Sequence, residues 1–168
     1  NSISGPSRAC MLTGKHSHAN GFINNSTTFN GDQLTFPKLL QQNGYQTAMI
    51  GKWHLVSDPQ GFDYWEILPG QGDYYNPTFI QMNGEKIQEE GYATNIITDK
   101  AINWIENRDE SKPFCMLLHH KAPHRTWMPD TCDLELFADK TFPLPENFYD
   151  NYEGRLAAQK QEMSIAKN

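Results

Sequence analysis

Two apolar stretches, each preceded by a helical pattern and followed by basic residues, restrict the fold more than any other feature of this chain. The stretches are 46–50 and 114–118. A helix is expected at 35–43, with Thr35 as its cap, and another at 95–107, where apolar residues recur at helical spacing. Helix followed by strand is typical of an α/β layer. We therefore predict an α/β fold in which the two strands are neighbours or near-neighbours and their carboxyl ends face one cleft.

Other local patterns predict less regular structure around this layer. Pro6 and Gly14 bound a short helix, and the polar segment 15–31 is expected to be a loop. Asn83-Gly84 predicts a hairpin between strands at 79–82 and 86–88. Beyond Asp130 the chain is rich in proline, and an amphipathic helix is expected at 152–167.

Composition limits the classes of partner. The 168 residues are 38% hydrophobic, which indicates a globular chain with one core. A net charge of -6 argues against a nucleic-acid binder, although a local cluster of Lys, Arg and His can still bind an anion. No apolar run approaches the roughly 20 residues of a membrane helix, so no membrane partner is expected. The three cysteines lack the CxxC spacing of a metal site.

The first cluster of chemically active residues opens the chain. Ser4 is expected just before a helix N-terminus, where unpaired backbone N–H groups and the helix dipole favour an anion. Arg8 lies one helical turn further on and can point back toward the same place. The alternative is that Ser4 only caps the helix and Arg8 lies on the surface.

Two further clusters follow the two predicted strands. Lys52 and His54 are two residues apart, so on an extended segment both side chains point into one pocket. There Lys52 supplies a positive charge and His54 holds or moves a proton. The alternative is a surface lysine and a packed histidine. Three histidines follow the second strand: His124, and His119 and His120, which compete with it or support it.

Taken together, these clusters resemble the motifs of the sulfatase family. The signature (Cys or Ser)-x-Pro-Ser-Arg, followed four residues later by Thr-Gly, is filled at each defined position, the Gly-Lys-Trp-His block is present, and His124 follows a proline as in the family's Pro-His block. The matching positions are Ser4, Pro6, Ser7, Arg8, Thr13 and Gly14, then Gly51, Lys52, Trp53 and His54, then Pro123 and His124.

The resemblance implies a mechanism and its cofactors. It implies that Ser4 is oxidised to formylglycine by a maturase of the serine type, and that one hydroxyl of the hydrated aldehyde attacks sulfur while the other expels sulfate. It assigns Arg8 to hold the nucleophile, Lys52 and His124 to grip the sulfate and the leaving oxygen, and His54 to take the second hydroxyl's proton. It also implies Ca²⁺, with formylglycine 4 as one ligand and carboxylate ligands outside 1–168.

The resemblance further implies the setting of the chain. We expect residues 1–168 to be part of a single catalytic domain of the alkaline-phosphatase superfamily, truncated at both ends, with a mixed sheet that is incomplete and with little activity alone. The resemblance to bacterial enzymes implies a periplasmic or extracellular location.

A narrower resemblance concerns the substrate. Three short segments resemble N-acetylglucosamine-6-sulfatases, namely 61–63, 74–76 and 82–84. They imply a sulfated glycan as substrate, unless they only build the hairpin and its neighbouring loop. Two rival functions remain: a phosphate or phosphonate ester hydrolase of the same superfamily, and a non-catalytic fragment that binds glycans.

Overall fold

The computed structural model describes residues 3–161 of the chain. It divides into two compact units, residues 1–128 and residues 129–168, each described by itself. The first unit contains the sheet and every candidate site residue.

A five-stranded mixed sheet forms the centre of the first unit, in the order β4-β3-β2-β1-β5. β1 pairs in parallel with β5 on one side and β2 on the other, whereas β3 and β4 are antiparallel. The predicted adjacency of the strands near 46–50 and 114–118 is confirmed. The strands are β1 (Gln46–Lys52), β2 (Tyr64–Leu68), β3 (Thr78–Gln81), β4 (Lys86–Gln88) and β5 (Phe114–His119).

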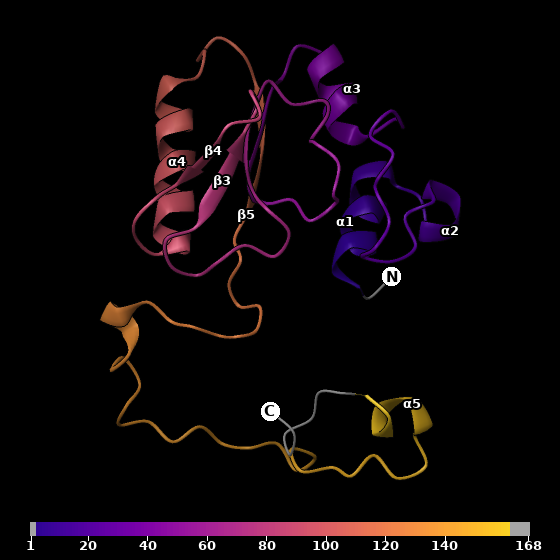
Figure 1. The fold of residues 1–168 in the computed structure, drawn as a ribbon, viewed down its shortest axis with the longest axis vertical. Coiled ribbons are helices and arrows are strands. Elements are labelled where there is room, and N and C mark those ends of the chain that lie inside the picture. Colours follow the sequence, from indigo (N-terminus) through magenta and orange to yellow (C-terminus); the bar gives the residue numbers. More distant parts are fainter. Residues whose placement is uncertain (1–2, 162–168) are drawn as a thin grey trace. The chain divides into compact units, whose positions relative to one another are not determined.

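Helices cover both faces of this sheet (Figure 1). α4 lies on one face, and α1, α2 and α3 lie on the other. Alternation along the strands supplies both cores: Met49 packs in the cluster that contains residues of α1, while Ile50 packs in the cluster that contains residues of α4. The helices are α1 (Ser4–Thr13), α2 (Ser17–Asn20), α3 (Phe36–Gln42) and α4 (Ala93–Asn107).

Several sequence predictions need correction. The segment 15–31 contains the short helix α2 and is not entirely loop. Thr35 precedes α3, but its side chain forms no capping hydrogen bond. β2 was not predicted, because Glu66 interrupts its apolar pattern; the buried carboxylate lies 2.5 Å from Lys100 of α4 and accepts a hydrogen bond from Gln81. The hairpin at Asn83-Gly84 is confirmed.

The second unit is largely irregular, as predicted beyond Asp130. Its described part contains a 3-10 turn, η1 (Thr131–Asp133), and one short helix, α5 (Leu156–Gln159). The expected helix at 152–167 is therefore wrong for 152–155 and for 160–161, and 162–167 lie outside the described residues. None of the helices within 3–161 is both long and apolar enough to cross a membrane.

Gly51 brings the carboxyl ends of β1 and β5 together. It pairs with His119 and has a φ of 99°, and a Cβ at Gly51 would lie 2.1 Å from the carbonyl oxygen of His119. Only glycine combines this backbone conformation with this close approach. This contact brings two candidate site residues together: His119, which pairs with Gly51, and Lys52, which follows Gly51 in the chain.

Gly51→Ala should destabilise the protein by more than the strain of its backbone alone, which is about 1–3 kcal/mol. Gly84→Ala is the matched control, because Gly84 also has a positive φ, of 81°, but a Cβ added there would have no neighbouring atom within 4 Å. Urea unfolding of the complete protein measures both variants. Equal losses of unfolding free energy would contradict the role given to the Gly51–His119 contact.

Candidate active site

Ser4 and His54 form the centre of the candidate site. Ser4 is the first residue of α1 and is half-buried, and its Oγ lies 3.1 Å from Nδ1 of His54. Ile3, not Ser4, occupies the N-cap position. The alternative in which Ser4 is a helix cap is therefore wrong, and its hydroxyl is available for chemistry.

The N-terminus of α1 differs from the prediction in the hydrogen bonding of its backbone N–H groups. The N–H of Gly5 donates to Oδ1 of Asn25 at 2.9 Å, and the N–H of Ser7 donates to the carbonyl of Ile3 at 2.9 Å. Pro6 has no N–H to offer. The expectation of several unpaired N–H groups is thus wrong here, so anion binding depends on the helix dipole and on side chains.

Lys52 is a buried cation that lacks a partner. It ends β1 and is 3% exposed, and its ammonium forms no hydrogen bond or ion pair with any residue of the described range. Burial, followed by the charges of Arg8 and Lys121, lowers its pKa to about 8. A cation on a largely buried residue is partly desolvated and has no counter-ion here within residues 3–161, and a bound anion would relieve that cost.

His54 reaches the site by a turn rather than by strand alternation. Its φ is 57°, in the left-handed region, so the extended geometry assumed from the sequence is wrong. Even so, His54 lies near three other candidate residues. Its pKa is lowered first by burial and then by the charges of Lys52, Arg8 and His124. The four side chains therefore face a common site, with a neutral His54 at pH 7.

Gln71 contacts the other side of the His54 ring, where its Nε2 lies 3.2 Å from Nε2 of His54. Lys121, only 8% exposed, holds this loop by donating to the carbonyl of Gln71 at 3.3 Å, and its ammonium lies 4.7 Å from the centre of the Tyr74 ring. Neither Gln71 nor Lys121 was selected from the sequence. The sequence pattern that could have indicated Lys121 is its place after a strand that ends in basic residues. No sequence pattern indicates Gln71.

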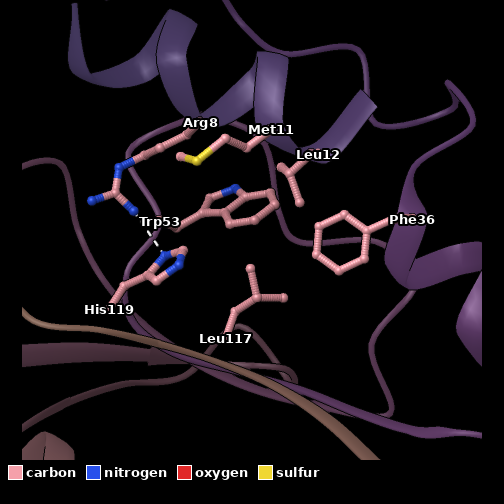
Figure 2. Close-up of a pocket in the computed structure, with 7 residues that line it drawn as sticks. All are labelled: Arg8, Met11, Leu12, Phe36, Trp53, Leu117 and His119. Carbon is pink, nitrogen blue, oxygen red and sulfur yellow. Dashed lines mark hydrogen bonds between the residues drawn. The ribbon is translucent and has the colours of Figure 1, made fainter. Parts of the chain in front are cut away.

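Arg8 is directed inward and does not lie on the surface. Its Nη1 donates to the carbonyl of Lys52 at 2.7 Å and lies 2.8 Å from Nδ1 of His119 (Figure 2). Burial lowers the pKa of its guanidinium. Within residues 3–161 it forms no hydrogen bond to Ser4, so a direct grip on the hydroxyl stays a prediction. Below it lies an apolar pocket whose lining includes Met11, Leu12, Phe36, Trp53 and Leu117.

His124 lies in the loop that follows β5. Its carbonyl accepts a hydrogen bond from the hydroxyl of Tyr74, and its Nδ1 lies 2.7 Å from the carbonyl of Arg125. Because a carbonyl only accepts, Nδ1 carries the proton, and Nε2 is left for a substrate. Of the three histidines in this region, only His124 contributes to the lowered pKa of His54. Its selection over His119 and His120 as the catalytic histidine stays a prediction.

The segments that suggested a glucosamine substrate have structural contacts. Asp63 accepts hydrogen bonds from the backbone and hydroxyl of Thr47, Asn76 accepts from the N–H of Gly91, and 82–84 form the hairpin turn. These contacts match the structural alternative. Tyr74 differs, because it also supports His124.

The residues present do not make a calcium site by themselves. Arg8, Lys52 and Lys121 are cations, and within residues 3–161 no three His, Cys, Asp or Glu side chains lie close enough together to hold a metal ion. No catalytic step is therefore derived through Ca²⁺, and the role of Ser4 as a metal ligand stays a prediction.

Fold and site together define an α/β protein in which a cluster of cationic side chains lies beside the Ser4 hydroxyl. The family model described as Sulfatase matches residues 1–163. The chain is 66% identical to an N-acetylglucosamine-6-O-sulfatase of Bacteroides thetaiotaomicron over 98% of its own length and 30% of that protein. It is 28% identical to the human N-acetylglucosamine-6-sulfatase, over 85% of this chain and 30% of that protein. The chain belongs to the sulfatase family.

Structural comparison agrees with this assignment. This chain superposes with a TM-score of 0.93 and 65% identity on a solved structure that is in complex with its substrate, D-glucosamine-2-N,6-O-disulfate. The alignment covers 99% of this chain and 34% of that one. The fold prediction, a mixed sheet flanked by helices, is confirmed. This chain spans about a third of the length of these relatives.

Proposed function

We propose that the complete protein hydrolyses sulfate esters of a sulfated glycan, with a sugar similar to N-acetylglucosamine-6-sulfate as substrate. One observation carries the proposal: Lys52, a residue only 3% exposed, has an ammonium without a partner among residues 3–161 that faces the same site as the Ser4–His54 pair. A sulfate ester provides the missing anion. The 66% identity to an N-acetylglucosamine-6-O-sulfatase supports the choice of sugar.

Each side chain has a role set by its charge and its protons: the cations bind sulfate, and the histidines transfer protons. Arg8 and Lys52 bind the sulfate oxygens and stabilise the charge that develops on them during the reaction. His124 in its doubly protonated form donates the Nε2 proton to the leaving oxygen and is left neutral, with its Nδ1–H still bonded to the Arg125 carbonyl. His54, neutral at pH 7, accepts a proton at Nδ1 from a hydroxyl at residue 4. This step requires the resting proton of His54 on Nε2, and therefore the Gln71 amide turned so that its oxygen, which has no other partner within residues 3–161, accepts from Nε2.

The fit of formylglycine rests on the surroundings of Ser4. Its Oγ lies within hydrogen-bonding distance of His54, and the half-buried side chain leaves room for oxidation. Once hydrated, formylglycine supplies two hydroxyls, which an unmodified serine lacks. Intact mass of the tryptic peptide tests the modification, because oxidation of Ser4 removes about 2 Da. The proposal includes a maturase as partner and a periplasmic or extracellular location.

The proposal also covers the extent of the catalytic unit. Residues 1–168 would be part of one larger catalytic domain, in which Ca²⁺ is held by carboxylates from outside this sequence together with residue 4. Calcium titration of the complete protein and of residues 1–168 tests this: we expect tight binding only by the complete protein.

The decisive experiment compares esters of the same sugar. The complete, matured protein should release sulfate from N-acetylglucosamine-6-sulfate and should act far more slowly on N-acetylglucosamine-6-phosphate. A preference for the phosphate ester would favour the rival hydrolase, and binding of the glycan without turnover would favour the non-catalytic alternative.

Sulfate affinity should fall as pH rises through about 8, because the pKa of Lys52 is about 8 and only its protonated form attracts the anion. The limiting slope is about tenfold per pH unit. His54 is already neutral in this range and adds no slope. Inhibition by inorganic sulfate between pH 6.5 and 9.5 measures the effect. Lys52→Met, the control, should bind sulfate weakly with no such slope, and an unchanged slope in that variant would contradict the assignment.

A further inference from the structure

The contact between Arg8 and His119 determines the protonation of that histidine. Arg8 Nη1 lies 2.8 Å from His119 Nδ1, and a guanidinium has only donors. His119 must therefore present a lone pair at Nδ1 and carry its proton on Nε2. The 3.3 Å approach of the same Nδ1 to the Lys52 carbonyl is then not a hydrogen bond.

Two acceptors thus occupy both N–H groups of Arg8 Nη1. One is the carbonyl of Lys52, at 2.7 Å, and the other is the ring of His119. Both acceptors lie at the paired carboxyl ends of β1 and β5, because His119 pairs with Gly51, the residue before Lys52. The guanidinium is therefore held from one edge (Figure 2), and no residue of 3–161 accepts a hydrogen bond from its remaining donors, which can bind an anion.

We propose that His119 is a positioning residue for Arg8: as a neutral imidazole it accepts a hydrogen bond from Nη1 and, with the Lys52 carbonyl, fixes the orientation in which the guanidinium meets the sulfate group. This inference rests on the proposed function and adds to it a residue that touches neither the sulfate nor the nucleophile.

The surroundings of His119 keep it in the required form. Burial first, and then the Arg8 charge, lower its pKa to about 4, so the ring is neutral at pH 7. Its neighbour His120 forms no such contact: the buried Nδ1 of His120 has no hydrogen-bond partner within residues 3–161. Since its lone pair is occupied, His119 is also unsuited to accept a proton during turnover.

Variants that move the acceptor atom test the proposal. In His119→Asn, the side-chain oxygen lies near the position of Nδ1 and can still accept from Arg8. In His119→Gln, the amide lies near the position of Nε2, and His119→Leu has no acceptor. In the complete, matured protein we expect kcat/KM to fall about 10–100-fold in the Gln and Leu variants, as for other residues that orient a functional group, and by less than about threefold in the Asn variant.

A double-mutant cycle with Arg8→Lys separates positioning from general structural support. A lysine cannot use both acceptors, so His119→Gln should reduce kcat/KM little further in that background. Full additivity, or equal activity of the Asn, Gln and Leu variants, would overturn the inference. If the Leu variant fails to fold, the comparison of Asn with Gln decides.

Binding of inorganic sulfate, measured by calorimetry, keeps this inference distinct from the proposed function. If the wild-type protein binds sulfate but hydrolyses no sulfate ester, the proposed function fails. The inference would still be supported by weaker sulfate binding in the Gln variant than in the Asn variant. If the wild-type protein hydrolyses sulfate esters and all three variants bind sulfate as the wild type does, the inference alone fails.

Discussion

Ser4→Ala should reduce kcat of the complete protein for a sulfate ester to background, a loss on the order of 10⁶-fold, as for other enzymes that lose their nucleophile. The reason is geometric as well as chemical. Ser4 carries the hydroxyl that lies 3.1 Å from His54, at the start of α1 and facing the cations of the site. Release of inorganic sulfate from N-acetylglucosamine-6-sulfate measures the loss.

The same variant should retain its affinity for inorganic sulfate, since Arg8 and Lys52 do not depend on the Ser4 hydroxyl for their positions. Arg8 is held by the Lys52 carbonyl and His119, and Lys52 lies in the central strand β1. Ser111→Ala, at an exposed turn before β5, is the control and should be fully active. Substantial sulfate release by Ser4→Ala would show that another group attacks sulfur.

The strand ends were the part of the site that could be predicted from sequence. Lys52 and His124 follow apolar stretches, and a parallel pairing of β1 with β5 places the residues after both strands at the same end of the sheet. Local pattern and topology agree there, so the prediction needed no knowledge of individual contacts. The hairpin at 83–84 was predictable for a similar reason, because its turn residues lie next to each other.

The missed features depend on partners that are distant in sequence. β2 holds a buried Glu66, which is tolerated because Lys100 and Gln81 contact it from α4 and β3. His119 gains its role from Arg8, 111 residues away in the chain. Gln71 lies in a glycine-rich turn that gives no sign of its contact with His54. Sequence patterns identify elements, whereas these roles arise only when elements pack together.

His54 lies near Lys52 for a different reason from the one expected from the sequence. Alternation along a strand was expected to point Lys52 and His54 into one pocket. In the structure β1 ends at Lys52, and the chain then turns, with His54 at a φ of 57°. A left-handed conformation at a non-glycine residue is uncommon and is often retained at functional sites. Trp53 holds the turn by donating to the carbonyl of Ser57 at 2.6 Å.

His54→Ala should lower kcat by about 10²–10⁴-fold, the usual contribution of a positioned proton acceptor. Because the pKa of His54 is lowered by burial and by the charges of Lys52, Arg8 and His124, its neutral form is available at pH 7. If it acts mainly in expelling sulfate, the variant should release the desulfated sugar in a rapid burst of about one equivalent per enzyme. Steady sulfate release should then be slow. Quenched-flow measurement of both products distinguishes the two steps.

Two further variants separate the loss of the imidazole from the strain of the turn. Asparagine tolerates the left-handed conformation better than alanine, so His54→Asn keeps the backbone while removing the base. It should be as slow as His54→Ala and more stable. His16→Ala, an exposed histidine stacked on His18, should be fully active. Slow turnover without a burst would place His54 in the attack on sulfur, consistent with its contact to Ser4. An unchanged kcat would show that the turn after β1 is scaffold and that a different group accepts the proton.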